Sequence, residues 1–334
     1  MDGAISATEP QYAIPATLNS LLCIGVWISL LACLLITAYA SYWPVQLLAI
    51  VAFSFIGNTC FALLHESVHG VLHPNRAVNR WLGRINAALF PTSYTFQRAT
   101  HLGHHARNRT DVEMFDLYYP TDNLFLKRMQ IYAILTGAPY WAAVVLGCVI
   151  FTFVPGLFNL KILRSKESQV IQHAGGDAMI SGLDKVPAAH VRLETLMFLI
   201  IQAGILAAMS WNWAAWLLCY LAFAVNWSSL QYTDHAFSAR DVRNGAWNLK
   251  VNPITRAFFL NYHDHLAHHQ YPWVPWIHLP KFVDDCDDGP SWLSNYLRLW
   301  RGPELTREPP PGPITPEFYR KINASPEEAG STSE

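Results

Sequence analysis

The sequence contains few charged residues. Lysine, arginine, aspartate and glutamate make up 14% of the 334 residues, whereas hydrophobic residues make up 52%. Soluble domains carry roughly a quarter charged residues, so this composition favours a protein with much of its surface in lipid. The net charge of -1 gives no reason to expect a nucleic-acid partner.

The sequence also lacks the motifs of built-in redox cofactors. Its six cysteines include no CxxC pair, and five of them stand in apolar stretches, where a free thiol behaves as a small hydrophobe. This pattern argues against a disulfide framework, a zinc ribbon or an iron–sulfur cluster. Neither a cytochrome b5-type haem motif nor a glycine-rich dinucleotide fingerprint is present. Any electrons used by this protein would therefore come from a separate carrier.

Long apolar stretches predict membrane-spanning helices. Residues 21–40 and 45–64 are each about 20 residues long, the length that a helix needs to cross a hydrocarbon core. A short turn at 41–44 would make them a hairpin. Residues 194–231 are too long for one crossing, and a polar break at 210–213 predicts a second hairpin. The first 20 residues have no lysine or arginine and so lack the positive region of a cleaved signal peptide.

The distribution of positive charge predicts the orientation. All 23 lysines and arginines fall within 65–130, 155–193 and 232–334, and the turns of the two hairpins have none. The positive-inside rule places these three regions in the cytoplasm, so an even number of crossings must separate them. Residues 131–154 are too short for two crossings and are predicted to be re-entrant or interfacial. The alternative is a single span at 131–154 with one long, tilted span at 194–231.

These patterns predict an all-α integral membrane bundle with about four transmembrane helices, one re-entrant or interfacial segment and a cytoplasmic helical cap. Residues 1–20 would form a tail, and 21–301 a membrane-embedded catalytic domain. Residues 302–334 are rich in proline at 309–311 and then acidic and rich in serine, which predicts disorder.

The histidines carry the chemistry of this sequence. Three tight groups stand out: His65 and His69, then His101, His104 and His105, and then His265, His268 and His269. Positions i, i+3 and i+4 share one face of a helix, so each group can aim its imidazoles at one point. His235 stands alone just past the last apolar stretch. A single such histidine is usually structural, but two identical triplets and a pair near hydrocarbon indicate a metal centre.

The first group also matches the HExxH motif of zinc proteases, in which two histidines bind zinc and a glutamate acts as general base. A catalytic zinc is satisfied by three protein ligands and a water. That interpretation would leave six further histidines without a role, so an intramembrane zinc protease is a remote alternative.

The order HxxxH, HxxHH, HxxHH, with the first box ending a transmembrane hairpin, resembles the membrane fatty acid desaturase and hydroxylase superfamily. The resemblance covers roughly residues 45–290, and the segments 234–236, 245–249 and 261–276 are similar to the third-box region of bacterial members. It implies a di-iron centre that uses O2 as co-substrate. The ligands implied are His65, His69, His101, His104, His105, His235, His265, His268 and His269.

Several neighbours of the boxes are candidate supporting residues. Family members often have an amide one turn before the lone histidine, which corresponds to Gln231. Acidic side chains can orient imidazoles through their outer nitrogens, and Glu66, Asp111, Asp116, Asp234 and Asp264 lie beside the boxes. The chain departs from the family at His263, an added histidine before the third box. On a helix His263 would point about 200° away from His265, so His265 is the preferred ligand.

The resemblance implies O2-dependent oxidation of a fatty acyl chain, and desaturation is the preferred reaction. The alternatives are oxidative decarboxylation of a free fatty acid to a terminal alkene, and hydroxylation or ketolation of a lipid or carotenoid. A non-enzymatic metal or lipid binder is a more distant possibility. The site would face the cytoplasm from a bacterial inner membrane.

The partners expected from this interpretation are a fatty acid or acyl lipid, membrane lipid, and a ferredoxin- or rubredoxin-like donor with its reductase. Arginines between 76 and 109 offer an acidic carrier a docking surface, but they equally satisfy the positive-inside bias.

The metal content of detergent-purified protein, measured beside a His268→Ala variant, tests this interpretation. We expect about two irons per chain in the parent protein and a sharp loss in the variant, because an imidazole of the third box would be removed. A single zinc with no iron would instead support the protease.

Overall fold

The computed structural model describes residues 12–160, 182–184, 186–312, 314 and 318. Among these residues, four helices are long and apolar enough to cross a membrane. They are α1 (Ala16–Tyr39), α2 (Trp43–His69), α9 (Ala188–Ala208) and α10 (Trp213–Gln231). The predicted all-α bundle is therefore confirmed. The helices α5 (Leu124–Leu135) and α6 (Ala138–Phe153) meet at a bend of 87° and form either one broken span or a re-entrant segment.

The outer faces of the long helices are apolar. Leu48 is 69% exposed, Ile200 is 72% exposed and Leu21 is 62% exposed. Apolar surface exposed to water is less favourable than the same surface in an apolar environment by roughly 25 cal/mol per Å². These faces are therefore suited to lipid. Inside the bundle, α2 packs against both α1 and α10.

Both hairpin turns lie at the same end of the bundle. The Tyr39 hydroxyl, at the end of α1, donates a hydrogen bond of 2.6 Å to the carbonyl of Ala208, at the end of α9. At the opposite end, the Asn19 amide donates to the carbonyl of Leu72, three residues past the end of α2. The first histidine group therefore lies at the end away from the turns, as the charge distribution predicted.

A second, shorter hairpin packs beside the long helices. It consists of α3 (Arg76–Leu89) and α4 (Tyr94–Arg107). At its turn, the Phe90 ring lies 5.3 Å from Phe61 of α2 and 5.1 Å from Trp227 of α10. The Tyr220 hydroxyl of α10 donates to the Leu89 carbonyl. The histidine spacing predicted a helix around His101–His105, but α3 and the hairpin were missed, because neither helix is long or apolar enough to resemble a span.

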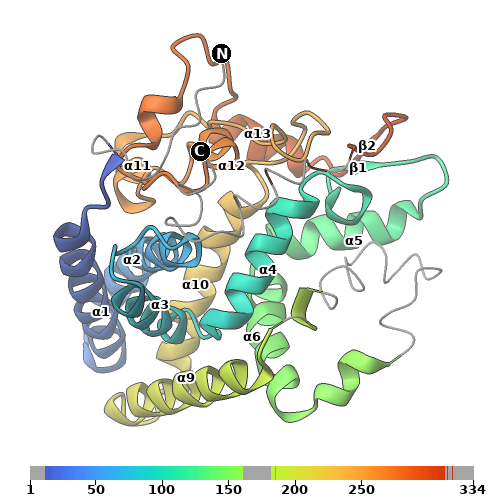
Figure 1. The fold of residues 1–334 in the computed structure, drawn as a ribbon. Helices are drawn as coiled ribbons and strands as arrows, with labels where there is room; N and C mark the ends of the chain where they lie inside the picture. Colours follow the sequence, from blue (N-terminus) through green and yellow to red (C-terminus); the bar gives the residue numbers. More distant parts are fainter. Residues whose placement is uncertain (1–11, 161–181, 185, 313, 315–317, 319–334) are drawn as a thin grey trace.

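The remaining elements are short, and most of them gather over the end of α2 and α10 (Figure 1). They are η2 (Asp111–Glu113), β1 (Leu117–Tyr118), η3 (Pro155–Asn159), α11 (Pro253–Phe258), α12 (His265–Gln270), η4 (Leu279–Phe282), α13 (Trp292–Leu299) and β2 (Glu304–Leu305). β1 and β2 pair in parallel, with Leu117 opposite Glu304. Most of the predicted terminal tails, at 1–11 and from 319 onward, lies outside the described residues.

A buried carboxylate joins α9 to the short hairpin. Glu194 is 4% exposed and accepts hydrogen bonds from the Arg84 guanidinium at 2.8 Å and from the Thr95 amide at 2.7 Å. The Ser93 hydroxyl, at the N-terminal cap of α4, donates to the same carboxylate. Glu194 therefore fixes the start of the helix that carries the second histidine group.

Replacing Glu194 tests this anchor. Glu194→Ala leaves the Arg84 guanidinium and an amide at the start of α4 without partners, which should lower the free energy of unfolding by about 3 kcal/mol. Thermal unfolding in detergent measures the loss. Leu193→Ala is the matched control, because Leu193 is 65% exposed on the same helix. Equal melting temperatures for the two variants would contradict the assignment.

Candidate metal centre

The first histidine pair lies on the last turns of one continuous helix. α2 extends through His65 and His69 and ends at Gly70, which adopts a left-handed conformation with φ of 78°. Helix ends leave carbonyl groups without partners, and these must be satisfied when they are buried. The Asn79 amide of α3 and the Tyr94 hydroxyl of α4 both donate to the Ser67 carbonyl, at 2.9 and 2.8 Å. The short hairpin thus holds the end of α2 in place.

The second group lies on α4, as its spacing predicted. The Ser93 side chain accepts from the Phe96 amide and so caps the start of this helix. His101 and His105 are one turn apart, and their Nε2 atoms lie 3.1 Å from each other. His104 sits between them in sequence and faces His235 instead, with 3.1 Å between the Nε2 atoms.

The third group lies on α12, a helix of only six residues, and neighbouring segments of the chain stabilise it by hydrogen bonds. The Asn248 side chain accepts from the Ala267 amide at 3.0 Å. The Trp247 carbonyl accepts from the Leu266 amide, and the Trp247 amide donates to the carbonyl of Asp234. The segment 245–249, noted in the sequence for its resemblance to the family, therefore connects the lone His235 to the third group.

Within the described part of the chain, the histidines form two groups suited to a metal ion. The first contains His65, His69, His101, His105 and His268, and the second contains His104, His235, His265 and His269. In each group the candidate ligand atoms lie within 4.8 Å of one another. All nine predicted histidines are included, from four separate segments of the chain, and His263 belongs to neither group.

The first group cannot be satisfied by hydrogen bonds among its own rings. The Nε2 atoms form a chain of contacts from His69 to His101 at 2.8 Å, to His105 at 3.1 Å and to His268 at 3.0 Å. A neutral imidazole nitrogen offers either one proton or one lone pair, so four such atoms make at most two hydrogen bonds across the three contacts. A cation at the centre would instead accept every lone pair, and imidazole suits iron, zinc and copper.

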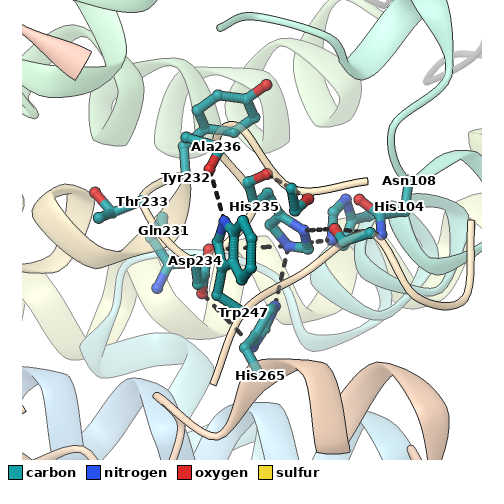
Figure 2. Close-up of polar contacts among 12 residues, drawn as sticks. His104, Asn108, Gln231, Tyr232, Thr233, Asp234, His235, Ala236, Trp247 and His265 are labelled. Carbon is teal, nitrogen blue, oxygen red and sulfur yellow. Dashed lines mark hydrogen bonds and ion pairs between the residues drawn. The ribbon is translucent and has the colours of Figure 1, made fainter. Parts of the chain in front are cut away.

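The second group has the same property. The Nε2 atom of His235 lies 3.1 Å from that of His104 and 3.0 Å from that of His265, and one ring nitrogen cannot satisfy both. Figure 2 shows His235 between these two rings. Neither carboxylate oxygen of the buried Asp234 has a hydrogen-bond partner. An uncompensated carboxylate is costly to bury, so the second group also fits a cation.

Burial keeps these imidazoles in the form that binds metals. It is the largest cause that lowers the pKa of His101, His105, His235 and His268 well below the ordinary value, and repulsion from neighbouring histidines adds to it. Only neutral imidazole has a free lone pair for a metal. The rings are therefore ready to bind at neutral pH without first losing a proton.

Two outer ring nitrogens of the second group have close partners that set their orientation. The Nδ1 atom of His235 lies 2.9 Å from the Gly245 carbonyl oxygen. The Nδ1 atom of His265 lies 3.5 Å from the Asp234 carboxylate but forms no hydrogen bond with it. The Nδ1 atom of His104 lies 2.6 Å from Glu113. A proton on Nδ1 leaves the Nε2 lone pair free for a metal. Glu113 was missed in the sequence, because nothing in its spacing from His104 shows the 3-10 turn that brings it back.

Glu113 is held as a charged group. Burial raises its pKa, but His104 and Arg107 together bring the pKa of the carboxyl below its ordinary value. The second oxygen of Glu113 lies 3.0 Å from the Arg107 side chain.

The other supporting residues expected from the sequence have different contacts. Glu66 accepts from the Trp276 amide at 2.9 Å and lies 3.9 Å from His65 Nδ1, too far for a hydrogen bond. Gln231 accepts from the Tyr262 hydroxyl at 3.4 Å. Asp111 and Asp116 pair with arginines, at Arg240 and Arg109 respectively.

His263 is buried next to Asp264, with 3.3 Å between its Nε2 atom and the carboxylate. The chain before the third group is a turn rather than a helix, because Leu260 and Asn261 have positive φ and α12 begins at His265. His263 belongs to neither cluster, and the helical angle used in the sequence argument does not apply to this turn.

The long apolar helices are those of a helical membrane protein. The two histidine groups at one end of them form a site suited to metal ions. A family model described as fatty acid desaturase matches residues 40–303. The chain belongs to the fatty acid desaturase family, so it is an oxidoreductase of an integral membrane class. A search of curated proteins gives no match to the chain.

Gly245 offers a test of the second group. A Cβ atom at this position would overlap the Asp241 carbonyl oxygen and the Arg109 side chain, so Gly245→Ala must move the carbonyl that faces His235. Loss of such a partner lowers metal affinity about 10- to 100-fold. We expect a metal ion bound at the second group to be removed at a lower chelator concentration from the variant than from the parent protein.

The control for this experiment is Gly204→Ala, because nothing lies within 4 Å of a Cβ atom at Gly204 in α9. Parent-like metal retention in Gly245→Ala would show that the carbonyl of residue 245 does not orient His235.

Proposed function

We propose that the chain oxidises a fatty acyl chain with O2 at a di-iron centre, and that the reaction is desaturation. The irons would be held by two sets of imidazoles. The first set is His65, His69, His101, His105 and His268, and the second is His104, His235, His265 and His269.

The observation that carries this proposal is the direct contact between two imidazole clusters at the end of apolar helices. The rings of His105 and His269, from different clusters, are 4.3 Å apart, and those of His265 and His268 are 5.5 Å apart. Two metal positions so close together can act on one substrate, as expected of a di-iron enzyme. A zinc protease would need only one such position, so the HExxH alternative explains less of the site.

The protein surrounds this centre with side chains that exclude water. Tyr262 packs against both clusters, with ring distances of 4.9 Å to His65 and 4.8 Å to His265. Beyond it lie Phe61 and Trp227, which belong to the helices of the bundle. These aromatic side chains give the imidazoles an apolar neighbourhood within the bundle, which is suited to an apolar chain that enters from the membrane.

Bound iron would supply the activation of O2 that side chains cannot provide. The chain's own contribution is to hold neutral imidazoles in fixed orientations and to keep the site dry. The Gly245 carbonyl and the Glu113 carboxylate perform the first task. A small cavity beside His65 and His268, lined also by Ala62 and Leu260, gives the first cluster an apolar neighbour.

The clustered positive charges support a bacterial inner-membrane protein with its site in the cytoplasm, and a ferredoxin- or rubredoxin-like donor. Three arginines in the proposed docking region are already engaged within the protein. Arg84 binds Glu194, Arg107 binds Glu113, and Arg109 is fully buried against Asp116. These three serve the fold, so a carrier would have to use other groups on this surface.

The proposal is tested by supplying iron-loaded protein in lipid nanodiscs with a ferredoxin, its reductase, NADPH, O2 and either free fatty acids or acyl lipids. We expect a product of unchanged chain length with one internal double bond. His105→Ala should reduce turnover by at least about 100-fold, because it removes the imidazole of the first cluster that contacts His269 of the second. Gly204→Ala should retain the parent rate.

Product analysis also decides among the related reactions. A terminal alkene one carbon shorter would replace desaturation by decarboxylation, and an alcohol or ketone would replace it by hydroxylation or ketolation. Fully iron-loaded protein that consumes reductant but oxidises no lipid would contradict the proposal as a whole.

A further inference from the structure

The two imidazole clusters have different charged surroundings. Around the second cluster, Glu113 lies 2.6 Å from the outer nitrogen of His104, and Asp234 lies 3.5 Å from that of His265. Near the first cluster, Glu66 lies 3.9 Å from His65 and uses one oxygen to accept from the Trp276 amide. The second cluster, which has four imidazoles rather than five, therefore lies closer to carboxylate groups than the first.

This asymmetry has a consequence for a centre that holds two ions of equal charge. Five neutral imidazoles add no negative charge to their ion, whereas two carboxylates offset much of the charge in the four-histidine cluster. A carboxylate that hydrogen-bonds the outer nitrogen of a histidine ligand, as Glu113 does with His104, also makes that ligand more basic. An ion of higher positive charge is stabilised by both effects, and more strongly in a buried site where screening by water is weak.

The following inference rests on the di-iron centre proposed above. We propose that, because of Glu113 and Asp234, the iron held by the four-histidine cluster is oxidised before the iron held by the other cluster. The step is the one-electron oxidation of one ferrous ion to ferric, with the electron passing to a soluble one-electron oxidant such as ferricyanide, which becomes ferrocyanide. Glu113 acts as a positioning residue through His104, since its carboxylate touches the outer nitrogen of that ring. Arg107 binds the other carboxylate oxygen and keeps this arrangement in place.

His104 connects the four-histidine cluster to the protein surface. Its side chain is 26% exposed, while the other eight histidines of the two clusters are each at most 9% exposed. The cluster that we expect to change charge first is thus also the one whose ligand reaches the surface. Electrons exchanged with a carrier would have the shortest path through this ring.

The test is Mössbauer spectroscopy of protein loaded anaerobically with two equivalents of 57Fe(II). Glu113→Gln identifies which Mössbauer signal belongs to the four-histidine cluster. The substitution alters only that cluster, because an amide offers one acceptor oxygen where the carboxylate offers two. One of the two ferrous signals should shift, or be lost if the affinity falls about 10- to 100-fold. Asp111→Asn is the control, since this carboxylate binds Arg240 and is 52% exposed.

The parent protein is then treated with one equivalent of ferricyanide per pair of irons. We expect the marked ferrous signal to disappear first, and in Glu113→Gln the two signals should decline together. Asp234→Asn should mark the same signal independently. Earlier loss of the unmarked signal, or parallel loss of both in the parent protein, would overturn the proposal. Iron content is measured first, so failure of the di-iron centre itself is recognised separately.

Discussion

The structure depends on keeping nine imidazoles within reach of one another, eight of them buried. Their mutual Nε2 contacts cannot all be hydrogen bonds, so the arrangement is unfavourable unless the surrounding protein enforces it and an ion completes it. The enforcement is distributed over the molecule. The end of α2 is held by Asn79 and Tyr94, the start of α4 by Glu194, and α12 by Asn248. Each of these contacts joins segments far apart in the sequence.

Local spacing was sufficient to predict much of this site. The repeated HxxHH pattern placed the second and third groups on helices, and both lie on helices, α4 and α12. The lengths of the apolar stretches predicted the four long helices, although α1 begins at Ala16 and α2 continues to His69. Lysine and arginine counts placed the two hairpin turns at one end, which agrees with the contact between Tyr39 and Ala208.

What the sequence could not show are contacts that depend on irregular backbone. Glu113 reaches His104 only because the chain turns back at Asp111–Glu113. The spacing of apolar and polar residues in the sequence does not predict such a turn. The α3–α4 hairpin was missed because its burial comes from packing against longer helices rather than from its own apolar length. His263, which the sequence argument set aside as a ligand, belongs to neither histidine group. Its segment is a left-handed turn at 260–261 and not the helix used in that argument.

The shortness of α12 constrains the order in which the protein can assemble. Six residues make too few internal hydrogen bonds to form a stable helix alone, so α12 depends on the 245–249 segment for its shape. Each cluster needs at least one histidine from α12. During synthesis the long hairpin of α1 and α2 can enter the membrane well before residue 265 has been made. Neither cluster can then be completed until α12 has left the ribosome, so the clusters form only after the first hairpin can already lie in the membrane.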